Sequence, residues 1–369
     1  MKYRRTRPVT LADLRRHALA RSLFAPTTLP KAMARLGFVQ ADPIRAPARA
    51  QDLTLFQRVA DYRAGELELR YPKLAVEEDS FVNYGFVTRG LQALMHPRQA
   101  RRVWTKARWA EARAVQDFVR ERGVVHPREV DAHFAYGKVT NWFGGSGNAS
   151  TQLLDGMHYR GLLRVGRREG GTRCYAAVDL HERSRPDDPD AALDALLDAA
   201  VTKYAPLPAR TLGWLASAVA RLAAPQWLAA RANALMRAKA RLATATVDGV
   251  VWYWPEGENP TSKRHRVDDR VRLLAPFDPV VWDRLRFELF WGWAYRFEAY
   301  TPAPKRKLGY YALPLLWRDA VIGWANLTLT DGRLEPSLGY VTGKSPRDAA
   351  FRAALDDELA RIARFLGAG

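Results

Sequence analysis

A glutamine and an aspartate two residues apart give this sequence its clearest capacity for hydrolytic chemistry. Gln40 and Asp42 stand in the run from Gly37 to Pro43. Because proline disfavours helical backbone at the preceding residue, the segment is predicted to be extended. Alternate side chains of an extended strand share one face, so both side chains should project together, with Cα atoms roughly 6.5–7 Å apart.

A carboxylate beside a carboxamide can hold one water molecule from two sides. The amide offers a donor and an acceptor, and the ionised carboxylate accepts. Such a pair suits hydrolysis at an electron-poor carbon, and the carboxylate also favours positive charge developing on a sugar. The ordinary alternative stays open at this point, since Asp before Pro often begins a turn and a neighbouring Gln can be a plain surface residue.

Two helices are predicted to lead into this strand. Thr10 and Asp13 form a capping-box pattern that opens a helix running to about Phe24. A second helix is expected from about Leu29, where the following proline suits a first turn, to Gly37 as its C-cap. The Gln-x-Asp segment, extended to Ile44, follows directly.

The middle of the chain carries the pattern of a winged helix-turn-helix. A long helix is expected over Gln99–Arg122, and short helices begin near His126 and Ala149. Strand-like runs follow at Leu162–Arg167 and Thr172–Val178, joined by a glycine-rich tip. Two helices followed by such a hairpin are typical of this DNA-binding unit.

A third section repeats this theme, and a β-rich section follows it. The strongest signal is Asp248-Gly249, a two-residue hairpin turn between two strand-like runs. From Val271 onward alternating patterns predict a small sheet or barrel. The elements expected in these sections are helices over 191–204, 210–221 and 225–241, strands over 293–300, 310–316 and 321–329, and a closing helix over 345–366.

These patterns predict an α+β fold, mainly α, with four domains. They are an N-terminal winged-helix unit with the Gln-x-Asp motif (1–122), a second winged-helix unit (123–182), a third (191–262), and a C-terminal β-rich, barrel-like domain with a closing helix (271–369). The Pro- and Asp-rich segment 183–190 is expected to be a linker.

The charge balance predicts an anionic partner. The chain of 369 residues has 58 Lys and Arg against 39 Asp and Glu, a formal net charge of +19. Residues 1–50 hold eleven basic and two acidic side chains, whereas residues 331–369 hold six of each. Such a basic face favours double-stranded DNA as the partner; an Arg-rich composition without a binding role is the alternative.

Several classes of protein are disfavoured. The single cysteine, Cys174, cannot form an internal disulfide or a Cys-rich zinc site, and no histidine shows ligand spacing, so neither a metal nor a cofactor is predicted. The basic start lacks the apolar run of a secretory signal, and no stretch of 18 apolar residues could span a membrane. We expect a cytoplasmic, nucleoid-associated monomer.

Several long motifs resemble one family of DNA-repair enzymes. The run Leu36–Ile44 resembles the AlkZ/YcaQ family of winged-helix DNA glycosylases, and Ala48–Ala50, Arg58 and Tyr62 agree with it. Three segments near the other end of the chain agree as well: Pro276–Arg284, Tyr295–Glu298 and Pro302–Pro314. The resemblance therefore spans almost the whole chain.

The resemblance implies tandem winged helices around a DNA channel, with a C-terminal β-domain. It implies monofunctional excision of alkylated purines, including unhooking of interstrand crosslinks, and places the catalytic pair at Gln40 and Asp42. Gln51 and Asp52 stand where many relatives have His, and Val82–Phe86 replaces a Glu-Tyr-Trp-x-His stretch, which indicates a divergent subgroup.

A mechanism follows from these residues as a hypothesis. An N7- or N3-alkylated purine already carries positive charge and needs little help from a general acid. Asp42 would polarise the water and stabilise the oxocarbenium-like sugar, while Gln40 would fix the water. No lysine is placed to act as a Schiff-base nucleophile, so strand cleavage is not expected.

Basic clusters are the candidate DNA contacts, with a solvated surface as the alternative for each. Phosphate contacts would make binding strongly dependent on salt. The candidates are Arg45 and Arg49 beside the catalytic pair, Arg167 and Arg168 on the second unit's wing, and Lys305, Arg306 and Lys307.

Three other functions compete with the glycosylase hypothesis. A winged-helix regulator would bind an undamaged operator, normally as a dimer on a palindromic site. A damage sensor would bind damaged DNA without hydrolysis. A metal nuclease is weaker, because only isolated acidic pairs such as Asp268-Asp269 and Asp356-Asp357 are available.

Overall fold

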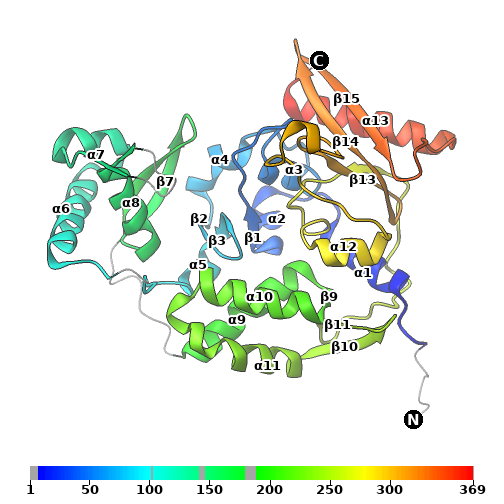
Figure 1. The fold of residues 1–369 in the computed structure, drawn as a ribbon, viewed down its shortest axis with the longest axis horizontal. Coiled ribbons are helices and arrows are strands. Elements are labelled where there is room, and N and C mark those ends of the chain that lie inside the picture. Colours follow the sequence, from blue (N-terminus) through cyan, green and yellow to red (C-terminus); the bar gives the residue numbers. More distant parts are fainter. Residues whose placement is uncertain (1–6, 101–102, 141–145, 179–187, 369) are drawn as a thin grey trace. The chain divides into compact units, whose positions relative to one another are not determined.

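The computed structural model describes residues 7–100, 103–140, 146–178 and 188–368. The chain divides into two compact units (Figure 1). Unit 1 comprises residues 1–66, 197–215 and 235–369, and unit 2 comprises residues 67–196 and 216–234. Most of the expected linker 183–190 lies outside the described residues. Within the described ranges, no helix is both long and apolar enough to cross a membrane.

The helices predicted before the Gln-x-Asp segment are confirmed. Helix α1 (Leu11–Ser22) begins with the expected capping box, in which Thr10 and Asp13 satisfy each other's backbone N–H groups. Helix α2 (Leu29–Leu36) ends at Gly37, whose φ of 67° is readily adopted by glycine. Strand β1 (Phe38–Gln40) follows at once and is buried along its length.

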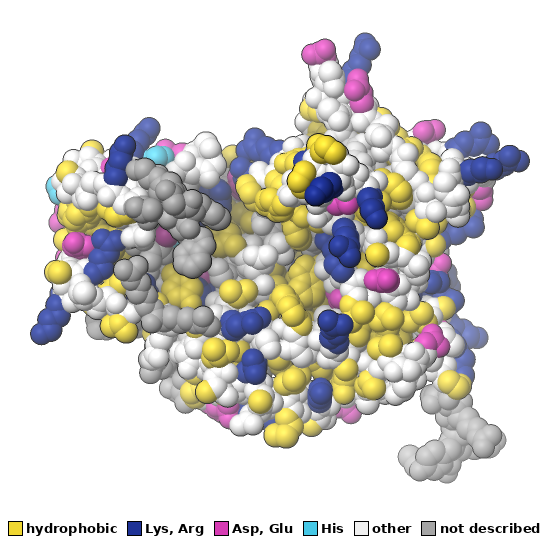
Figure 2. All heavy atoms as spheres, in the orientation of Figure 1, with side chains coloured by type: hydrophobic (Ala, Val, Ile, Leu, Met, Phe, Trp, Pro, Cys, Tyr) yellow, Lys and Arg dark blue, Asp and Glu magenta, His cyan; other side chains and the backbone are white. Residues whose placement is uncertain are grey.

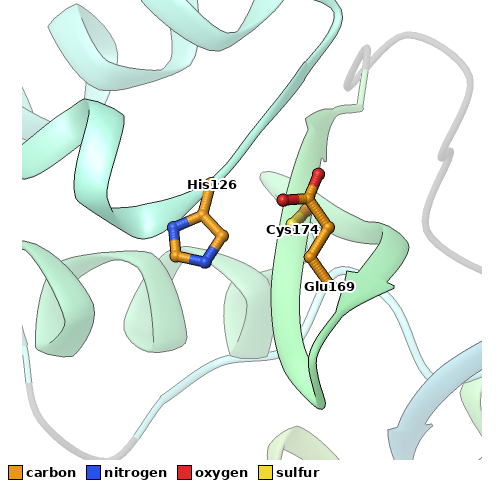
Figure 3. Close-up of side chains that lie close together, drawn as sticks. All are labelled: His126, Glu169 and Cys174. Carbon is orange, nitrogen blue, oxygen red and sulfur yellow. The ribbon is translucent and has the colours of Figure 1, made fainter.

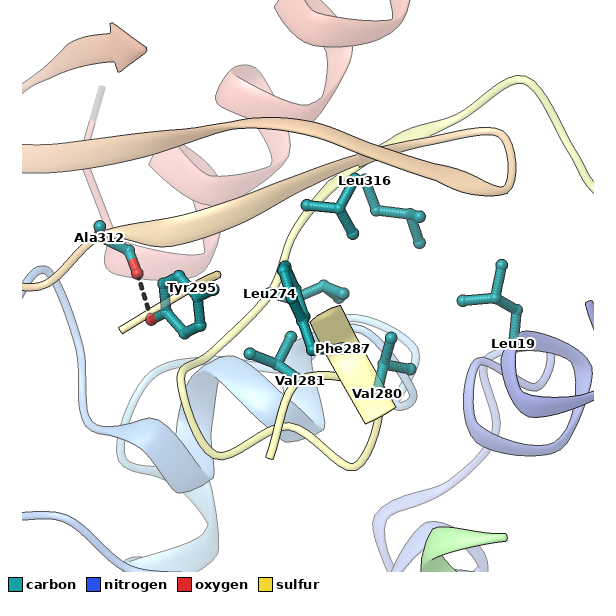
Figure 4. Close-up of a cluster of buried hydrophobic side chains, with 9 residues drawn as sticks. Leu19, Leu274, Val280, Val281, Phe287, Tyr295, Ala312 and Leu316 are labelled. Carbon is teal, nitrogen blue, oxygen red and sulfur yellow. Dashed lines mark hydrogen bonds between the residues drawn. The ribbon is translucent and has the colours of Figure 1, made fainter. Parts of the chain in front are cut away.

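A hydrophobic cluster within unit 1 joins segments far apart in sequence (Figure 4). Leu19 of α1 packs there with residues that follow strand β12 (Val271–Leu273) and with helix α12 (Arg284–Trp291). The hydroxyl of Tyr295 donates to the carbonyl of Ala312 at 2.7 Å. The core members are Leu19, Leu274, Val280, Val281, Phe287, Tyr295, Ala312, Leu316 and Val321.

The C-terminal part of unit 1 is an antiparallel sheet with a helix packed on it. The strand order is β12–β13–β14–β15, with β13 at Leu313–Trp317, β14 at Ala320–Thr330 and β15 at Arg333–Tyr340. Helix α13 (Ala349–Leu366) packs on β12. Two predicted strands are thereby confirmed, but the barrel is not: among the described residues, β12 and β15 remain edges and no pairing closes the sheet.

The predicted strand over 293–300 is wrong. Residues 293–298 form no regular element, and the preceding residues form helix α12 instead. Asp283 caps this helix by accepting from the backbone N–H of Arg286, and Gly292 ends it in the left-handed region. The chain beyond Gly292 is irregular, and its aromatic rings serve the core: Trp293 Nε1 donates to the Val321 carbonyl at 3.0 Å.

Unit 2 contains the second set of predicted helices and the hairpin. Its long helix α6 (Lys106–Arg122) begins at Lys106 rather than at Gln99, because Thr105 caps the later position. The other predicted elements are confirmed with small shifts at their ends: α7 (Pro127–Phe134), α8 (Ala149–Arg160), β7 (Leu163–Glu169) and β8 (Thr172–Ala177). Further short elements were not predicted individually. They are α4 (Glu66–Arg70), which starts at the unit boundary, η1 (Tyr71–Lys73), β2 (Val76–Ser80), β3 (Tyr84–Thr88), α5 (Arg89–Ala93), β4 (Val124–Val125), β5 (Lys138–Thr140) and β6 (Ser146–Asn148).

Three helices carry the chain between the units, and a hairpin follows. The hairpin pairs β10 (Leu242–Val247) with β11 (Val250–Pro255), and Asp248 and Gly249 both have positive φ, as the predicted tight turn requires. The helices are α9 (Pro189–Tyr204), α10 (Ala209–Leu222) and α11 (Arg231–Arg241), with the short strand β9 (Leu207–Pro208) and helix η3 (Pro225–Ala230) between them.

Candidate active site

The Gln-x-Asp segment lies where strand β1 ends and the chain turns. The Asp42 carboxylate accepts from the backbone N–H of Ile44 at 2.7 Å. The aspartate thus begins a turn, which is the structural role that Asp before Pro often has. The backbone N–H of Asp42 donates to the side-chain oxygen of Gln51 at 3.2 Å. Gln51 belongs to α3 (Ala50–Phe56), and this helix thus fixes the backbone at the carboxylate.

Both candidate catalytic side chains are buried. Gln40 is 6% exposed and Asp42 is 7% exposed. Among the described residues, no partner lies within hydrogen-bond distance of Gln40 Oε1. Because a buried polar atom normally has a partner, this acceptor is suited to a water molecule or a substrate group.

Burial also sets the electrostatics of Asp42. Removal from water raises the pKa of its carboxyl above the usual value, and the hydrogen bond from Ile44 opposes that rise. A carboxylate with a raised pKa is a stronger base, as acceptance of a proton from water requires.

A second buried carboxyl supports the site from α3. Asp52 accepts from the Tyr62 hydroxyl at 2.8 Å and from the backbone N–H of Gly65 at 3.0 Å. Burial raises the pKa of Asp52, while these hydrogen bonds and the charges of Arg49 and Arg45 lower it. The structure therefore brings both predicted arginines near Asp52, whose two hydrogen bonds fix the chain that follows α3.

A fully buried ion pair joins the two regions whose motifs resemble the glycosylase family, one near the start of the chain and one near its end. Arg58 and Asp278 form two hydrogen bonds of 2.7 and 2.9 Å, and both side chains are 0% exposed. Arg58 also donates to the carbonyls of Ser22 and Thr54. The interaction ties the Pro276–Arg284 segment to the helices that flank β1.

A hollow of about 400 Å³ opens on the sheet side of the Gln-x-Asp turn. It is lined by Arg45, Tyr310, Tyr311 and Asn326, together with neighbouring residues of the turn and of β14. Asn326 shapes one wall, because its side chain accepts from the Tyr311 N–H and donates to the Leu308 carbonyl.

The predicted basic loop borders the same region of unit 1. Lys305 and Lys307 are exposed, and Arg306 lies over the ring of Tyr310 with 5.0 Å between guanidinium carbon and ring centre. Glu298 accepts from the backbone N–H groups of Lys307 and Leu308. The loop is thus held by its backbone, which leaves the two lysine side chains in solvent.

The two predicted arginines on the hairpin of unit 2 differ in their surroundings. Arg168 makes two hydrogen bonds to the buried carboxylate of Glu78, at 2.6 and 2.8 Å, and donates to the Gly171 carbonyl. Arg167 is exposed and pairs with Glu169 at 2.6 Å. Arg168 therefore stabilises unit 2, whereas Arg167 can exchange an exposed carboxylate for a phosphate.

A cluster that the sequence did not predict lies on unit 2 (Figure 3). Ligand atoms of His126, Glu169 and Cys174 all lie within 4.8 Å of one another. Each group already has a structural role, however. His126 Nδ1 accepts from the Arg128 N–H at the start of α7, Glu169 pairs with Arg167, and burial raises the pKa of the Cys174 thiol. These partners compete with a metal for the imidazole lone pair and the carboxylate.

A buried lysine contacts the strand that carries Gln40. Lys203 of α9 is 6% exposed and donates to the carbonyl of Phe38. Burial lowers the pKa of Lys203 to about 7, and the charge of Arg58 acts in the same direction. Its bond to the backbone of β1 is a positioning contact.

Sequence reasoning missed three supporting side chains of this site, namely Gln51, Lys203 and Tyr311. Gln51 and Lys203 each bond to the backbone of the Gln-x-Asp segment, and the Asp42 charge acts on Tyr311. Lys203 and Tyr311 are far from Asp42 in sequence. The signal for Gln51 was its place on a helix that follows the strand within ten residues.

Basic side chains are prominent on the surface of the molecule. On the face that Figure 2 shows, Lys and Arg side chains are spread over both helical and sheet regions, and acidic ones are fewer. This agrees with the net charge of +19.

Comparisons with known proteins give a family and a fold. The family model described as DNA glycosylase AlkZ-like matches residues 33–365. The structure is similar to that of the Streptomyces sahachiroi DNA glycosylase AlkZ, with a TM-score of 0.63 and 15% sequence identity over 98% of each chain. At that identity, the structural likeness establishes the shared fold alone.

Proposed function

Because the chain belongs to the AlkZ-like DNA glycosylase family, we propose that it hydrolyses the N-glycosidic bond of cationic purines alkylated at N7 or N3. The substrate is a lesion in double-stranded DNA, and the reaction is monofunctional: the base leaves and an abasic site remains. Gln40 and Asp42 carry the chemistry.

The observation that supports this most directly is a buried carboxylate two residues from a buried amide acceptor that lacks a partner. Asp42 and Gln40 are both buried, and among the described residues Gln40 Oε1 has no protein partner. A water molecule held there donates one hydrogen to Gln40 and the other to Asp42. It then presents its lone pair to the sugar.

The reaction balances with these two residues and water. The C1′–N9 bond breaks, and its electron pair neutralises the positive charge of the alkylated purine. The carboxylate stabilises the oxocarbenium-like sugar that remains, since it is aimed at the charge that develops. Water adds at C1′ and gives its proton to Asp42, which yields the abasic sugar and the free base.

The rest of the chain supplies the DNA-binding surface in this proposal. We assign tandem winged-helix units to residues 1–122, 123–182 and 191–262, with the sheet domain at 271–369. The order of α7, α8, β7 and β8 supports this assignment for the winged-helix unit at residues 123–182. The phosphate contacts would be Arg45 and Arg49, the loop residues Lys305, Arg306 and Lys307, and Arg167 on the hairpin. The protein would act as a monomer at the nucleoid.

The test is base release from a duplex that carries one N7-methylguanine, under single-turnover conditions. We expect abasic product from the wild type and strongly reduced product from Asp42→Asn and Gln40→Ala, with unchanged binding to undamaged duplex. Wild-type protein that binds duplex but releases no base from this or an N3-alkylated lesion contradicts the proposal. A duplex with an alkylated-purine crosslink then tests whether the same site unhooks crosslinks.

A further inference from the structure

We infer that the hollow beside the Gln-x-Asp turn receives the purine of the lesion and that the Tyr311 hydroxyl donates a hydrogen bond to that base. This inference rests on the proposed function and adds to it a binding site and a recognition residue. The hollow's volume of about 400 Å³ falls within the range of about 300–1,000 Å³ that is usual for small-molecule pockets.

The first observation is a buried donor without a partner. Tyr311 lines the hollow and is only 2% exposed. Its backbone is held by Asn326, but in the described part of the chain no group lies within hydrogen-bond distance of its hydroxyl. A phenol that is out of water and unpaired is costly, and a ligand acceptor in the hollow would relieve that cost.

The second observation links Tyr311 to the reacting centre. Burial raises the pKa of Tyr311, and the negative charge of Asp42 raises it further. The phenol therefore stays protonated and acts only as a donor or a neutral acceptor. The Asp42 charge thus acts on a phenol that lines the hollow.

The lining of the hollow fits a cationic purine on a nucleotide. Tyr310 is 43% exposed and offers an aromatic surface, which attracts a flat cation. Arg45 is exposed at the rim and suits the adjacent phosphate. An N7-alkylated purine keeps a free ring nitrogen, N3, on the edge next to the glycosidic bond, and Tyr311 can donate to it while the bond breaks.

The test compares Tyr311→Phe with Tyr204→Phe as a matched control. Tyr204 is also fully buried, and its hydroxyl likewise lacks a partner among the described residues, but it packs against Trp282 and does not line the hollow. Both variants lose one unpaired hydroxyl, so neither should lower the melting temperature. A purely structural role for Tyr311 thus predicts that the two variants behave alike.

Two measurements separate this inference from the proposed function. The first is affinity for a duplex whose N7-methylguanine carries a 2′-fluoro group, which slows cleavage, relative to undamaged duplex. The second is the single-turnover rate of base release from the unmodified lesion. We expect Tyr311→Phe to lose about tenfold in both, as the loss of one hydrogen bond predicts, while Tyr204→Phe matches the wild type.

Each outcome decides one question. If Tyr311→Phe keeps the wild-type rate and lesion preference, the assignment of Tyr311 is overturned and the proposed function stands. If the wild type neither prefers nor cleaves the lesion, the proposed function fails, and this inference fails with it. A loss of rate in both tyrosine variants would show a general effect of buried hydroxyls and would overturn the specific role of Tyr311.

Discussion

At the scale of single residues, the site is built on a buried acid that folding alone would not favour. Asp42 gives up its hydration and receives one backbone hydrogen bond in return, so its charged form is penalised in the folded protein. Two residues earlier in the chain, Gln40 adds a buried acceptor that has no hydrogen-bond partner among the described residues. Such unfavourable features cluster at catalytic sites, because the reaction uses the interactions that folding leaves unsatisfied.

The first prediction concerns Asp42→Asn. The amide keeps the acceptor for Ile44 but cannot take a proton from water, so we expect base release to fall by at least about 100-fold. The raised pKa of Asp42 means that its contribution to stability is lost as pH rises through that pKa. At pH 7 the variant should therefore be at least as stable as the wild type, measured by urea unfolding. A marked loss of stability would show that the charge supports the fold.

The second prediction concerns pH. Only ionised Asp42 can accept a proton, so the single-turnover rate should rise with pH and level off. The midpoint should lie above the value of about 3.9 that is ordinary for Asp, since burial raises this pKa. A pH–rate profile of the wild type checks it, and Gln40→Ala, which keeps the carboxyl, should retain the same rising limb. A midpoint at or below the ordinary value would exclude Asp42 as the base.

At the scale of elements, short strand β1 is held by side chains from several helices. Lys203 of α9 bonds to the Phe38 carbonyl, and Gln51 of α3 bonds to the Asp42 N–H. The buried pair of Arg58 and Asp278 fixes the helices around the strand. The strand is too short to be fixed by its own pairing, so these contacts place the proposed catalytic residues.

The third prediction tests the buried ion pair. Asp278→Asn leaves the Arg58 charge buried without its counter-charge, and we expect a loss of about 3–5 kcal/mol in the free energy of unfolding. Asp269→Asn is the matched control, because Asp269 pairs with Arg318 in solvent and should cost less than about 1 kcal/mol. Similar effects of the two variants in urea unfolding would contradict the assigned role.

The fourth prediction concerns Lys203. Its pKa is lowered to about 7, so the unfolded chain binds more protons than the folded protein between that value and the ordinary pKa of Lys. Stability should therefore rise with pH from about 7 towards 9, by at most about 1.4 kcal/mol per pH unit. Lys203→Met should flatten this rise. An equal slope in both proteins would show that Lys203 is not the titrating group.

At the scale of the whole molecule, charge sets the partner and the conditions for binding. A net charge of +19 favours polyanions, and phosphate contacts release counterions. Basic side chains differ in availability, however: Arg168 is taken up by Glu78, while Lys305 and Lys307 extend into solvent. The total charge therefore overstates the number of phosphate contacts.

The fifth prediction concerns salt. Affinity for undamaged duplex should fall steeply between 50 and 200 mM salt. The double variant Lys305→Ala, Lys307→Ala should lower the slope of log affinity against log salt by about 2, as the loss of two phosphate contacts requires. Lys31→Ala, Lys263→Ala removes the same charge from other exposed positions of unit 1. Equal slopes for the two double variants would show that net charge acts without a specific loop contact.

The sequence by itself determined what depends on local signals. The capping box at Thr10, the glycine after α2 and the Asp248-Gly249 turn fixed their elements, because caps and turns act over a few residues. The motifs that resemble the glycosylase family indicated the family and singled out the Gln-x-Asp pair. The strand predicted from the alternating aromatic residues over 293–300 is wrong, because rings such as those of Trp293 and Tyr295 pack in the core without a paired strand.

Only the tertiary structure decided what surrounds that pair. Burial of Asp42, the contact from Lys203 and the place of Tyr311 all depend on segments that lie more than 150 residues from the motif or on the packing around it. No local pattern encodes such distances. The pKa of a carboxyl and the availability of an arginine are likewise set by neighbours in space. The sequence therefore predicted Arg168 as a DNA contact, whereas in the structure its side chain is paired with Glu78.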